Sequence, residues 1–514
     1  MVVEDQGAVI ALLSDPATHG GEPVERIETH ASVIFLAGSR AWKLKRAVKY
    51  DFLDFSGVER RRAMCEAELR LNRRTAPELY QRVVPVVRRA DGTLALGGAG
   101  DAVDWVIEMV RFDQDLLLDR LAERGALDPA LMPPLAEAIA ALHRDAERRP
   151  DQGGAAGMAW VVDGNEADLT AAAGALDPDL LRDVIDRTRA ALERGRGLLE
   201  SRRRAGFVRH CHGDLHLGNI VLWQGRPVPF DGVEFNDAVS CVDVLYDLAF
   251  LLMDLWRRQL PAHASDVFNR YLATTGVTGG LSLLPLFLSC RAAVRSKISL
   301  ANAALEGDAR RRGNLEDQAR QYLNLAHTFL RPPRATIVAV GGVSGTGKST
   351  LARRLAPSLG AAPGAVVLRS DVIRKRLCGV PESARLGPEG YTSDVTARVY
   401  AHLVDEAAAI AASGHSVIAD AVFGRDEDKR AIEGAAARVG VPFTGIWLEA
   451  PEKVLVDRVD RRRGDASDAD ADVVRRQLTS RPSPGTWLVV DASRAPDAVL
   501  DDVRAQLSSS VSSS

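Results

Sequence analysis

The sequence predicts a two-lobed α+β domain followed by an α/β domain with a parallel sheet. Residues 24–110 are strand-rich with one helical segment, and residues 115–330 are mostly helical, which together predict a small sheet lobe and a helical lobe. After residue 331, short apolar runs alternate with helical patterns, as is typical of a parallel sheet covered by helices. The chain of 514 residues is long enough for roughly three compact units of about 150 residues each.

The boundary between the two domains is predicted at Arg331-Pro332-Pro333-Arg334. A helical pattern over 315–330 stops there, because proline lacks the amide donor and restrains the residue before it. A strand-like run begins at Thr336. The predicted divisions are a small lobe at about 1–110, a helical lobe at about 111–330, a second domain at 331–507 and a disordered, serine-rich tail at 508–514.

Composition excludes several classes of protein. The formal net charge is −3, and neither half has the basic excess expected of a nucleic-acid binder. The five cysteines form no CxxC pair, which favours a reducing compartment over a disulfide framework. The N-terminus lacks the order of a signal peptide, and the most apolar stretch, 244–256, is interrupted by Asp247 and Asp254. We therefore expect a cytoplasmic protein that binds neither membrane nor nucleic acid.

The first chemical motif is His212-Gly213-Asp214-Leu215-His216-Leu217-Gly218-Asn219. Its H-x-D-x-x-x-x-N spacing is that of a phosphotransfer loop, in which Asp214 would accept the proton of the substrate hydroxyl and Asn219 would hold magnesium. A short strand at 227–230 then ends at Asp231, which is the expected second metal ligand, because magnesium prefers oxygen ligands. We interpret His216, and also Asp247 farther on, as structural.

The preceding lobe offers the remaining parts of such a site. Residues 33–36 and 41–45 read as a hairpin whose second strand carries Lys43 and Lys45 on one face. Either lysine could reach nucleotide phosphates, and we favour Lys43. In the following helix, Glu66 and Glu68 are candidates to pair with that lysine, and we favour Glu68. The strand at 105–110 is expected to lead into an inter-lobe hinge near Met109 that would read adenine through backbone groups.

These residues resemble the aminoglycoside phosphotransferase family of kinase-like folds, which includes choline and sugar kinases. The resemblance covers residues 24–330 and is most specific at His212–Asn219 and Asp231. It implies an ATP-dependent phosphotransferase. The region lacks the G-x-G-x-x-G loop and the Ala-Pro-Glu segment of protein kinases, which favours a small-molecule acceptor.

The second motif is a phosphate-binding loop, Gly342-Val343-Ser344-Gly345-Thr346-Gly347-Lys348-Ser349. A strand-like run precedes it and a helical pattern follows it, which is the order that the G-x-x-x-x-G-K-S motif requires. Backbone amides of the loop would surround the phosphates, Lys348 would reach the terminal ones, and the Ser349 hydroxyl would bind magnesium. The expected nucleotide contacts are Gly342, Ser344, Gly345, Thr346, Gly347, Lys348, Ser349 and Thr350.

Other strand ends of this domain carry candidate acceptor and metal residues. The run Arg369-Ser370-Asp371-Val372-Ile373-Arg374 follows a predicted strand and resembles small P-loop kinases such as gluconate kinase, chloramphenicol phosphotransferase and the zeta-toxin group. That resemblance implies that Asp371 orients or deprotonates the acceptor hydroxyl and that Arg374 binds substrate. Asp371 also fits a helix N-cap.

Three further features complete this predicted site. Asp420 ends the best Walker-B-like strand and would position the metal or bind substrate, and Arg425 is a further candidate for substrate binding. Arg458 and Arg462 lie one helical turn apart, where a lid would neutralise charge on the transferred phosphoryl group. A solvated arginine face is the alternative.

The sequence as a whole resembles fusions of an aminoglycoside-phosphotransferase-like domain with a P-loop kinase domain. We predict a bifunctional ATP-dependent and magnesium-dependent kinase with two active sites. Its acceptors would be hydroxyls of sugar, aminosugar or aminocyclitol-like molecules. One alternative is a nucleotide-binding regulatory module that controls a single active kinase, and another is polynucleotide-end kinase activity of the P-loop domain. The sequence carries no signal for oligomeric state.

Overall fold

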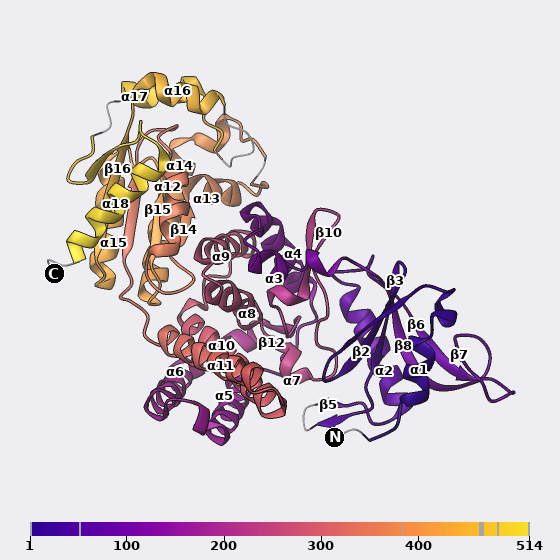
Figure 1. Cartoon of the computed structure of the whole chain (residues 1–514). Coiled ribbons are helices and arrows are strands. Elements are labelled where there is room, and N and C mark those ends of the chain that lie inside the picture. The colour runs from indigo at the N-terminus through magenta and orange to yellow at the C-terminus, as the bar shows by residue number, and fades with distance from the viewer. Residues whose placement is uncertain (1–2, 51–52, 383, 462–466, 481–482, 512–514) are drawn as a thin grey trace. The chain divides into compact units, whose positions relative to one another are not determined.

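The computed structural model describes residues 3–50, 53–382, 384–461, 467–480 and 483–511 (Figure 1). Its contacts divide the chain into two compact units, one of residues 1–164 and 192–254 and the other of residues 165–191 and 255–514. Helices between residues 255 and 330 thus group with the C-terminal sheet, which differs from the expected boundary near residue 331. That boundary stays a prediction.

The small lobe is a six-stranded sheet in the order β1-β2-β3-β8-β6-β7. The predicted hairpin is confirmed, because β2 and β3 pair antiparallel with Ile34 opposite Lys43. Helix α1 packs Val9 and Leu13 against one face of the sheet, and α2 packs Cys65 against the other. The elements are α1 (Gly7–Ser14), β1 (Val24–Glu28), β2 (Ser32–Ala37), β3 (Arg40–Lys45), β4 (Lys49–Tyr50), β5 (Leu53–Asp54), α2 (Val58–Asn72), β6 (Tyr80–Arg88), β7 (Leu94–Leu96) and β8 (Asp101–Val110).

Residues from 111 to 330 are mostly helical, as predicted, with two short antiparallel strand pairs, β9 with β12 and β10 with β11. The H-x-D-x-x-x-x-N motif lies between β9 and β10. β11 ends at Pro229, and Asp231 comes two residues later, after Phe230. The elements are α3 (Leu118–Glu123), α4 (Met132–Asp145), α5 (Gly154–Ala171), α6 (Pro178–Arg204), β9 (Val208–His210), β10 (Ile220–Trp223), β11 (Arg226–Pro229), α7 (Asp237–Ser240), β12 (Cys241–Asp243), α8 (Val244–Arg257), α9 (Pro261–Thr275), α10 (Leu284–Leu305) and α11 (Ala309–Phe329).

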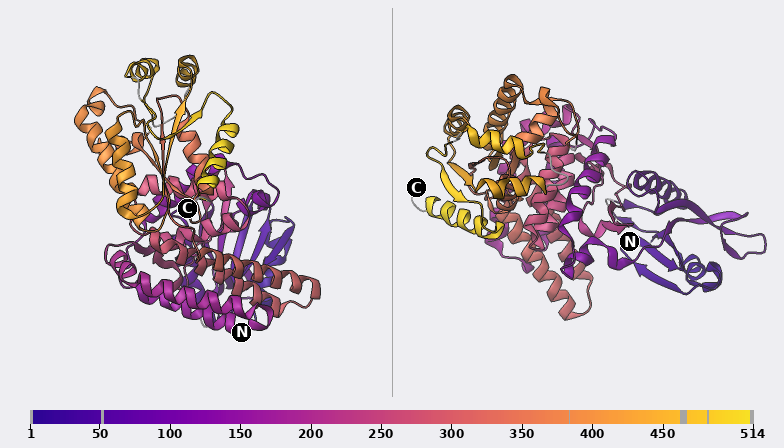
Figure 2. Two further views of the ribbon diagram at one scale, coloured as in Figure 1. Left: turned by 90° about the vertical axis from the view of Figure 1, so that its left-hand side faces the viewer. Right: turned by 90° about the horizontal axis from the view of Figure 1, so that it is seen from above.

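The C-terminal part is built on a five-stranded sheet in the order β14-β15-β13-β16-β17, and every pair is parallel, as predicted. Helices lie on both of its sides in the left view of Figure 2. Leu351 of α12 and Val503 of α18 share one apolar cluster with Val338 and Leu448 of the sheet. The elements are β13 (Ile337–Gly341), α12 (Lys348–Leu355), β14 (Val366–Arg369), α13 (Ser370–Leu377), α14 (Ser393–Ala412), β15 (Val417–Asp420), α15 (Asp426–Val439), β16 (Phe443–Glu449), α16 (Glu452–Asp460), α17 (Ala471–Thr479), β17 (Leu488–Asp491) and α18 (Pro496–Val511).

The expected disordered tail from residue 508 stays a prediction, although α18 continues to Val511. Buried Val499, Leu500 and Val503 anchor the helix on the sheet. Once a helix is nucleated, each added residue costs little, so serines can continue it. Residues 512–514 lie outside the described part of the chain. Within the described residues, no helix has both the length and the apolar character needed to cross a membrane.

Candidate active sites

The first candidate site is centred on Asp214 and Asn219, which lie on the loop between β9 and β10. The Asn219 side-chain amide donates to the Asp214 carbonyl oxygen and to its carboxylate Oδ2, both at 3.0 Å. This pairing uses the Nδ2 of Asn219 and leaves its Oδ1 for a cation. His216 approaches the same carboxylate oxygen, with its Nε2 3.4 Å from Asp214 Oδ2, and its Nδ1 accepts a hydrogen bond from the Gly218 amide at 3.1 Å.

The backbone of this loop is held from α8. Asp247 is fully buried, and its carboxylate accepts hydrogen bonds from the amides of His212 at 3.2 Å and Gly213 at 2.8 Å. His143 of α4 contacts the same carboxylate at 3.0 Å. Asp247 therefore positions the loop without reaching a substrate, in line with the structural role expected from the sequence.

His143, Asp247 and Cys211 bring three possible metal ligands together. Burial raises the pKa of the Cys211 thiol well above its usual value, which opposes the thiolate that a metal needs. The Cys211 thiol instead donates to the Val242 carbonyl at 3.5 Å, and Asp247 is engaged as described above. We interpret this cluster as structural.

Lys43 of β3 lies between two carboxylates. Its Nζ contacts Glu68 Oε1 of α2 at 2.8 Å and also contacts the Asp231 carboxylate. Burial opposes the lysine charge, but Asp231 and Glu68 outweigh it, so the pKa of Lys43 lies well above its usual value. The structure thus brings together Lys43, Glu68 and Asp231, which the sequence selected separately. The alternative partner Glu66 points elsewhere and pairs with Arg62 at 3.1 Å.

Lys45 forms a second, deeper bridge to the same glutamate. Its Nζ contacts Glu68 Oε2 at 2.6 Å and Glu234 Oε1 at 2.5 Å, and only 2% of its side chain is exposed. Burial disfavours the charge of Glu68, but Lys43 and Lys45 together lower its pKa. Each oxygen of Glu68 therefore serves one lysine. Sequence reasoning named Lys45 only as the weaker alternative and missed Glu234, which follows Asp231 by three residues.

Two features refine the nucleotide side of this site. Asp231 has a left-handed backbone, with φ +61°, and its amide donates to the Tyr80 hydroxyl at 3.2 Å. Met109 lies inside β8, opposite both Ala41 and Tyr80, and its side chain belongs to an apolar cluster. β8 ends at Val110, one residue after Met109, and the Arg111 amide still donates to the Ser39 carbonyl at 2.9 Å. The expected nucleotide contact at Met109 stays a prediction.

The second candidate site surrounds the phosphate-binding loop between β13 and α12. Gly342 has φ +135°, and a Cβ there would lie 2.6 Å from the Leu448 carbonyl oxygen. Gly345 has φ +88°, and a Cβ there would lie 2.7 Å from the Leu455 carbonyl oxygen. Both positions therefore require glycine for conformation and for space. Expected contacts from Ser344 to Thr350 line one cavity of about 1070 Å³.

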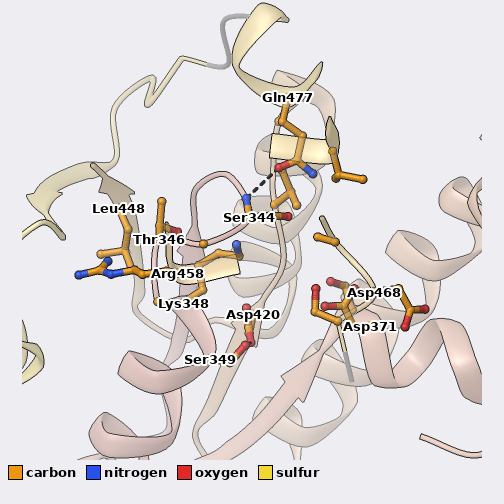
Figure 3. Close-up of a pocket in the computed structure, with 18 of the residues that line it drawn as sticks. Ser344, Thr346, Lys348, Ser349, Asp371, Asp420, Leu448, Arg458, Asp468 and Gln477 are labelled. Carbon is orange, nitrogen blue, oxygen red and sulfur yellow. Dashed lines mark hydrogen bonds between the residues drawn. The ribbon is translucent and has the colours of Figure 1, made fainter. Parts of the chain in front are cut away.

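Lys348, Ser349 and Asp420 line this cavity, and Ser349 and Asp420 lie side by side (Figure 3). The Ser349 hydroxyl donates to Asp420 Oδ2 at 2.5 Å, which joins the start of α12 to the end of β15. Lys348 Nζ donates to the Val343 carbonyl at 3.0 Å. A hydroxyl and a carboxylate so close together form an oxygen donor pair that fits magnesium.

Asp371 lies at the opposite end of the cavity from Leu448 and Arg458, and Asp468 is beside it (Figure 3). It is the second residue of α13, which begins at Ser370, and Arg369 is the N-cap residue. Burial and, next, the negative charge of Asp420 raise its pKa. A half-buried carboxyl with a raised pKa that faces a cavity is suited to proton transfer.

The other predicted residues of this site differ in whether they line the cavity. Arg374 and Arg425 both line the cavity, and Arg425 pairs with Asp428 at 2.8 Å. Arg458 lines it from α16, whereas Arg462 lies outside the described residues. Asp468 was missed by sequence reasoning, although it accepts hydrogen bonds from the Tyr391 hydroxyl at 2.9 Å and the Leu386 amide at 3.0 Å.

Gln477 of α17 was also missed. Its Oε1 accepts a hydrogen bond from the Ser344 amide at 2.8 Å, at the phosphate-binding loop (Figure 3). A lone glutamine on a polar helix gives no sequence signal for such a contact. Arg461, which belongs to the arginine cluster expected to form a lid, also lines the cavity. Further lining residues without a sequence signal are Arg385, Tyr391, Tyr400, Ser467, Arg476, Ala492, Arg494, Pro496 and Val499.

The chain is an ATP-dependent kinase made of two phosphotransferase-type domains, because both domains belong to kinase or phosphotransferase families. Residues 53–282 match the model of a phosphotransferase enzyme family, and residues 337–484 match that of an AAA domain. Proteins of Mycobacterium tuberculosis (strain ATCC 25618 / H37Rv) and Mycobacterium bovis, both described as uncharacterized, are each 31% identical over 461 residues, which is 87% of this chain and 88% of theirs. The chain belongs to the family of these mycobacterial proteins.

Other similarities cover single parts of the chain. An adenylyl-sulfate kinase of Myxococcus xanthus (strain DK1622) is 32% identical over 122 residues, 24% of this chain and 62% of its own. An ethanolamine kinase structure from Plasmodium vivax covers 61% of this chain and 86% of its own at 11% identity, with a TM-score of 0.39. A gluconokinase structure from Sinorhizobium meliloti 1021 matches 34% of this chain and 92% of its own chain at 22% sequence identity, with a TM-score of 0.26.

Proposed function

We propose that the chain is a bifunctional small-molecule kinase that transfers the γ-phosphoryl group of ATP to acceptor hydroxyls at two separate sites. The proposed acceptors are sugars, aminosugars or aminocyclitol-like molecules. One observation supports the proposal: each candidate site has a carboxylate suited to act as a base, oxygen donors of the kind that magnesium prefers, and a lysine. These sets are Asp214, Asn219, Asp231 and Lys43 in the first site, and Asp371, Ser349, Asp420 and Lys348 in the second.

In the first site, Asp214 would accept the proton of the acceptor hydroxyl. The Asn219 amide at 3.0 Å fixes the carboxylate, and its Oδ1 together with Asp231 would hold magnesium. Lys43, held by Glu68, would contact the nucleotide phosphates. Magnesium ATP, when bound, supplies the phosphoryl group and neutralises charge on the phosphates.

In the second site, Asp371 would take the proton of the acceptor hydroxyl, because its carboxyl faces the cavity and its raised pKa favours proton uptake. Ser349 and Asp420 would hold magnesium, and Lys348 would turn from the Val343 carbonyl to the phosphates. Arg458 lines the cavity and would neutralise charge on the transferred group.

The test is ATP consumption with a panel of sugars, aminosugars, aminoglycosides and nucleosides, measured for wild type, Asp214→Ala, Lys348→Ala and the double variant. Two sites predict that some acceptors depend on Asp214 alone and others on Lys348 alone, and that the double variant is inactive. Glu66→Gln is the matched control, because Glu66 lies on α2 but pairs with Arg62 at the surface. If neither single variant loses any wild-type activity, the two-kinase proposal fails.

A further inference from the structure

Helix α9 covers the outer edge of the P-loop sheet. β14 is an edge strand that pairs with β15 on its inner side. On its outer side, the Asn269 side chain accepts a hydrogen bond from the Val367 amide at 2.7 Å and donates one to the Ala365 carbonyl at 3.1 Å. One side-chain amide therefore satisfies two backbone groups that a neighbouring strand would otherwise pair. Phe268 of α9 is fully buried, and its ring centroid lies 5.4 Å from that of His415.

An ion pair joins the next residue of α9 to the segment that lines the Asp371 end of the cavity. The Arg270 guanidinium contacts the Glu382 carboxylate, and these side chains are 31% and 30% exposed. The backbone of Glu382 is held as well, because the buried Lys375 donates to its carbonyl at 2.8 Å. Leu386, farther along this segment, lines the cavity. Arg270 therefore contacts Glu382 at a point where the backbone is already fixed.

Glu382 in turn shares Arg369 with the proposed magnesium ligand. Arg369 is the last residue of β14, and its Nη1 lies 4.0 Å from Glu382 Oε1. Its Nε lies 3.6 Å from Asp420 Oδ2, the oxygen that accepts a hydrogen bond from the Ser349 hydroxyl at 2.5 Å. Both separations exceed the length of a hydrogen bond, so the guanidinium is attracted by two carboxylates and bonded closely to neither of them. Its position therefore depends on the balance between the two negative charges.

These contacts form a chain of alternating charge that leads from α9 to the magnesium site and consists of Arg270, Glu382, Arg369 and Asp420. The side chains are between 5% and 31% exposed, so water screens their interactions less than it screens fully exposed ion pairs. Arg270 neutralises part of the Glu382 charge. Glu382 therefore attracts Arg369 less strongly. Arg369 then stays closer to Asp420, where its positive charge competes with a metal cation.

We infer that Arg270 is a positioning residue of the P-loop site and acts through Glu382 and Arg369 to set how strongly Asp420 binds magnesium. The inference rests on the proposed function of that site. Arg270, Glu382 and Arg369 do not line the cavity, so their influence on it passes through Asp420. The P-loop site thus depends on α9, a helix from the part of the chain that matches the phosphotransferase family.

A charge chain of this kind predicts variants with effects of opposite sign. Arg270→Met leaves the Glu382 charge without its arginine on α9. Arg369 is then drawn away from Asp420, so magnesium should bind more tightly. Glu382→Gln removes that pull and leaves Arg369 to Asp420, so magnesium should bind more weakly. If these side chains only supported the fold, both variants would weaken the site. The hydrogen bonds and apolar packing described above hold α9 without Arg270, so Arg270→Met should fold.

The first experiment measures the magnesium concentration that gives half-maximal ATP consumption at the P-loop site. The full chain carries Asp214→Ala, and the acceptor is one from the panel above whose turnover Lys348→Ala abolishes. We expect that concentration to fall about 3- to 10-fold in Arg270→Met and to rise about 3- to 10-fold in Glu382→Gln. Shifts in the same direction, or no shift in either variant, overturn the inference.

Three further variants test the route of the effect. Arg270→Lys keeps the positive charge and should behave as wild type. In a double variant, Arg270→Met should have no effect beyond that of Glu382→Gln, because Arg270 acts only through Glu382. A separate effect of Arg270→Met in the double variant overturns the inference. Arg376→Met is the matched control and should leave the magnesium requirement unchanged, because Arg376 pairs with Glu406 at 2.8 Å and does not line the cavity.

The second experiment needs no turnover. A non-hydrolysable ATP analogue is titrated calorimetrically with and without magnesium, and Lys348→Ala identifies the heat that belongs to the P-loop site. The gain in affinity that magnesium gives should be larger in Arg270→Met than in wild type, and smaller in Glu382→Gln. The opposite order, or no difference, overturns the inference. If the proteins rank as expected but no ATP consumption depends on Lys348, the kinase function fails and the charge chain stands.

Discussion

The side-chain amide of Asn219 donates a hydrogen bond to the carboxylate of Asp214 at 3.0 Å. The same nitrogen donates to the Asp214 carbonyl, so one group fixes both the backbone and the side chain of the proposed base. Asn219 therefore has two separable tasks in the proposed mechanism. Its nitrogen orients Asp214, and its oxygen would bind metal.

Substitution of Asn219 should separate these tasks. Asn219→Ala removes both, and we expect kcat of the first site to fall by about 100-fold and the magnesium requirement to rise. Asn219→Asp restores an oxygen ligand but cannot donate to Asp214, so it should recover magnesium affinity without recovering kcat. The measurement is kcat as a function of magnesium concentration. Equal recovery of both quantities would contradict the orienting role.

Lys45→Met should destabilise the small lobe more than Lys43→Met does. Removing the buried Lys45 leaves Glu234 without its lysine and Glu68 with only one, and breaking a buried ion pair costs about 3–5 kcal/mol. Lys43 is nearer the surface, with 11% of its side chain exposed, so Lys43→Met should mainly abolish activity. Urea-induced unfolding measures the difference. Lys49→Met, at a lysine with 62% exposure, is the control and should change stability little.

The P-loop activity should have an acid limb set by Asp371. A general base acts only when deprotonated, so activity should fall as the pH drops through the Asp371 pKa. Burial and Asp420 raise that pKa, so the fall should come at a higher pH than for an exposed aspartate. Asp371→Asn should lower kcat by about 10²- to 10⁴-fold and remove the limb. A pH profile of kcat/KM that keeps the same limb in Asp371→Asn would assign it to another group.

His415 should make stability depend on pH. It is buried, its ring bonds to the Gly364 carbonyl at 2.8 Å, and burial lowers its pKa to about 4 from 6.5. Because the folded pKa lies below the unfolded one, protonation favours unfolding. The contribution of neutral His415 to the free energy of unfolding is fully present above about pH 6.5. It is lost as the pH falls towards 4, and the total loss is about 3 kcal/mol.

The matched variant is His415→Gln, which can donate to Gly364 and does not titrate. Unfolding free energies of both proteins, measured in urea at pH 7 and pH 5, isolate the histidine contribution. Wild type should lose more stability than the variant. Equal losses would show that other groups carry the pH dependence.

Local patterns predicted the parts of each site that lie within one segment. The loop from His212 to Asn219 and the loop from Gly342 to Ser349 each combine several functional residues at fixed spacing, and each lies between elements of the expected kind. The parallel sheet was predictable because buried strands of such sheets read as continuous apolar runs. Lys43 and Glu68 were found because helix and hairpin periodicity limited the choices to two residues each.

Contacts between distant segments left no such pattern. Gln477 lies 133 residues from its partner Ser344, and a glutamine on an exposed helix looks like any solvated residue. Asp468 lies within an acidic stretch, residues 465–472, in which no single carboxylate stands out. The hinge near Met109 stays a prediction, because strand periodicity indicates that a strand exists but does not fix its last residue.

The carboxylate of Asp247 holds backbone amides of the motif loop from 34 and 35 residues away. It accepts hydrogen bonds from main-chain amides, so this anchor of the loop does not depend on the Asp214 side chain. A relative could therefore have another residue in place of Asp214 and keep a folded but inactive loop. Loss of Asp247 would instead remove the hydrogen bonds that hold the loop backbone. In a related chain, an aspartate at the position of Asp247 therefore indicates that the loop keeps its fold. An aspartate at the position of Asp214 indicates that the loop keeps its proposed catalytic base.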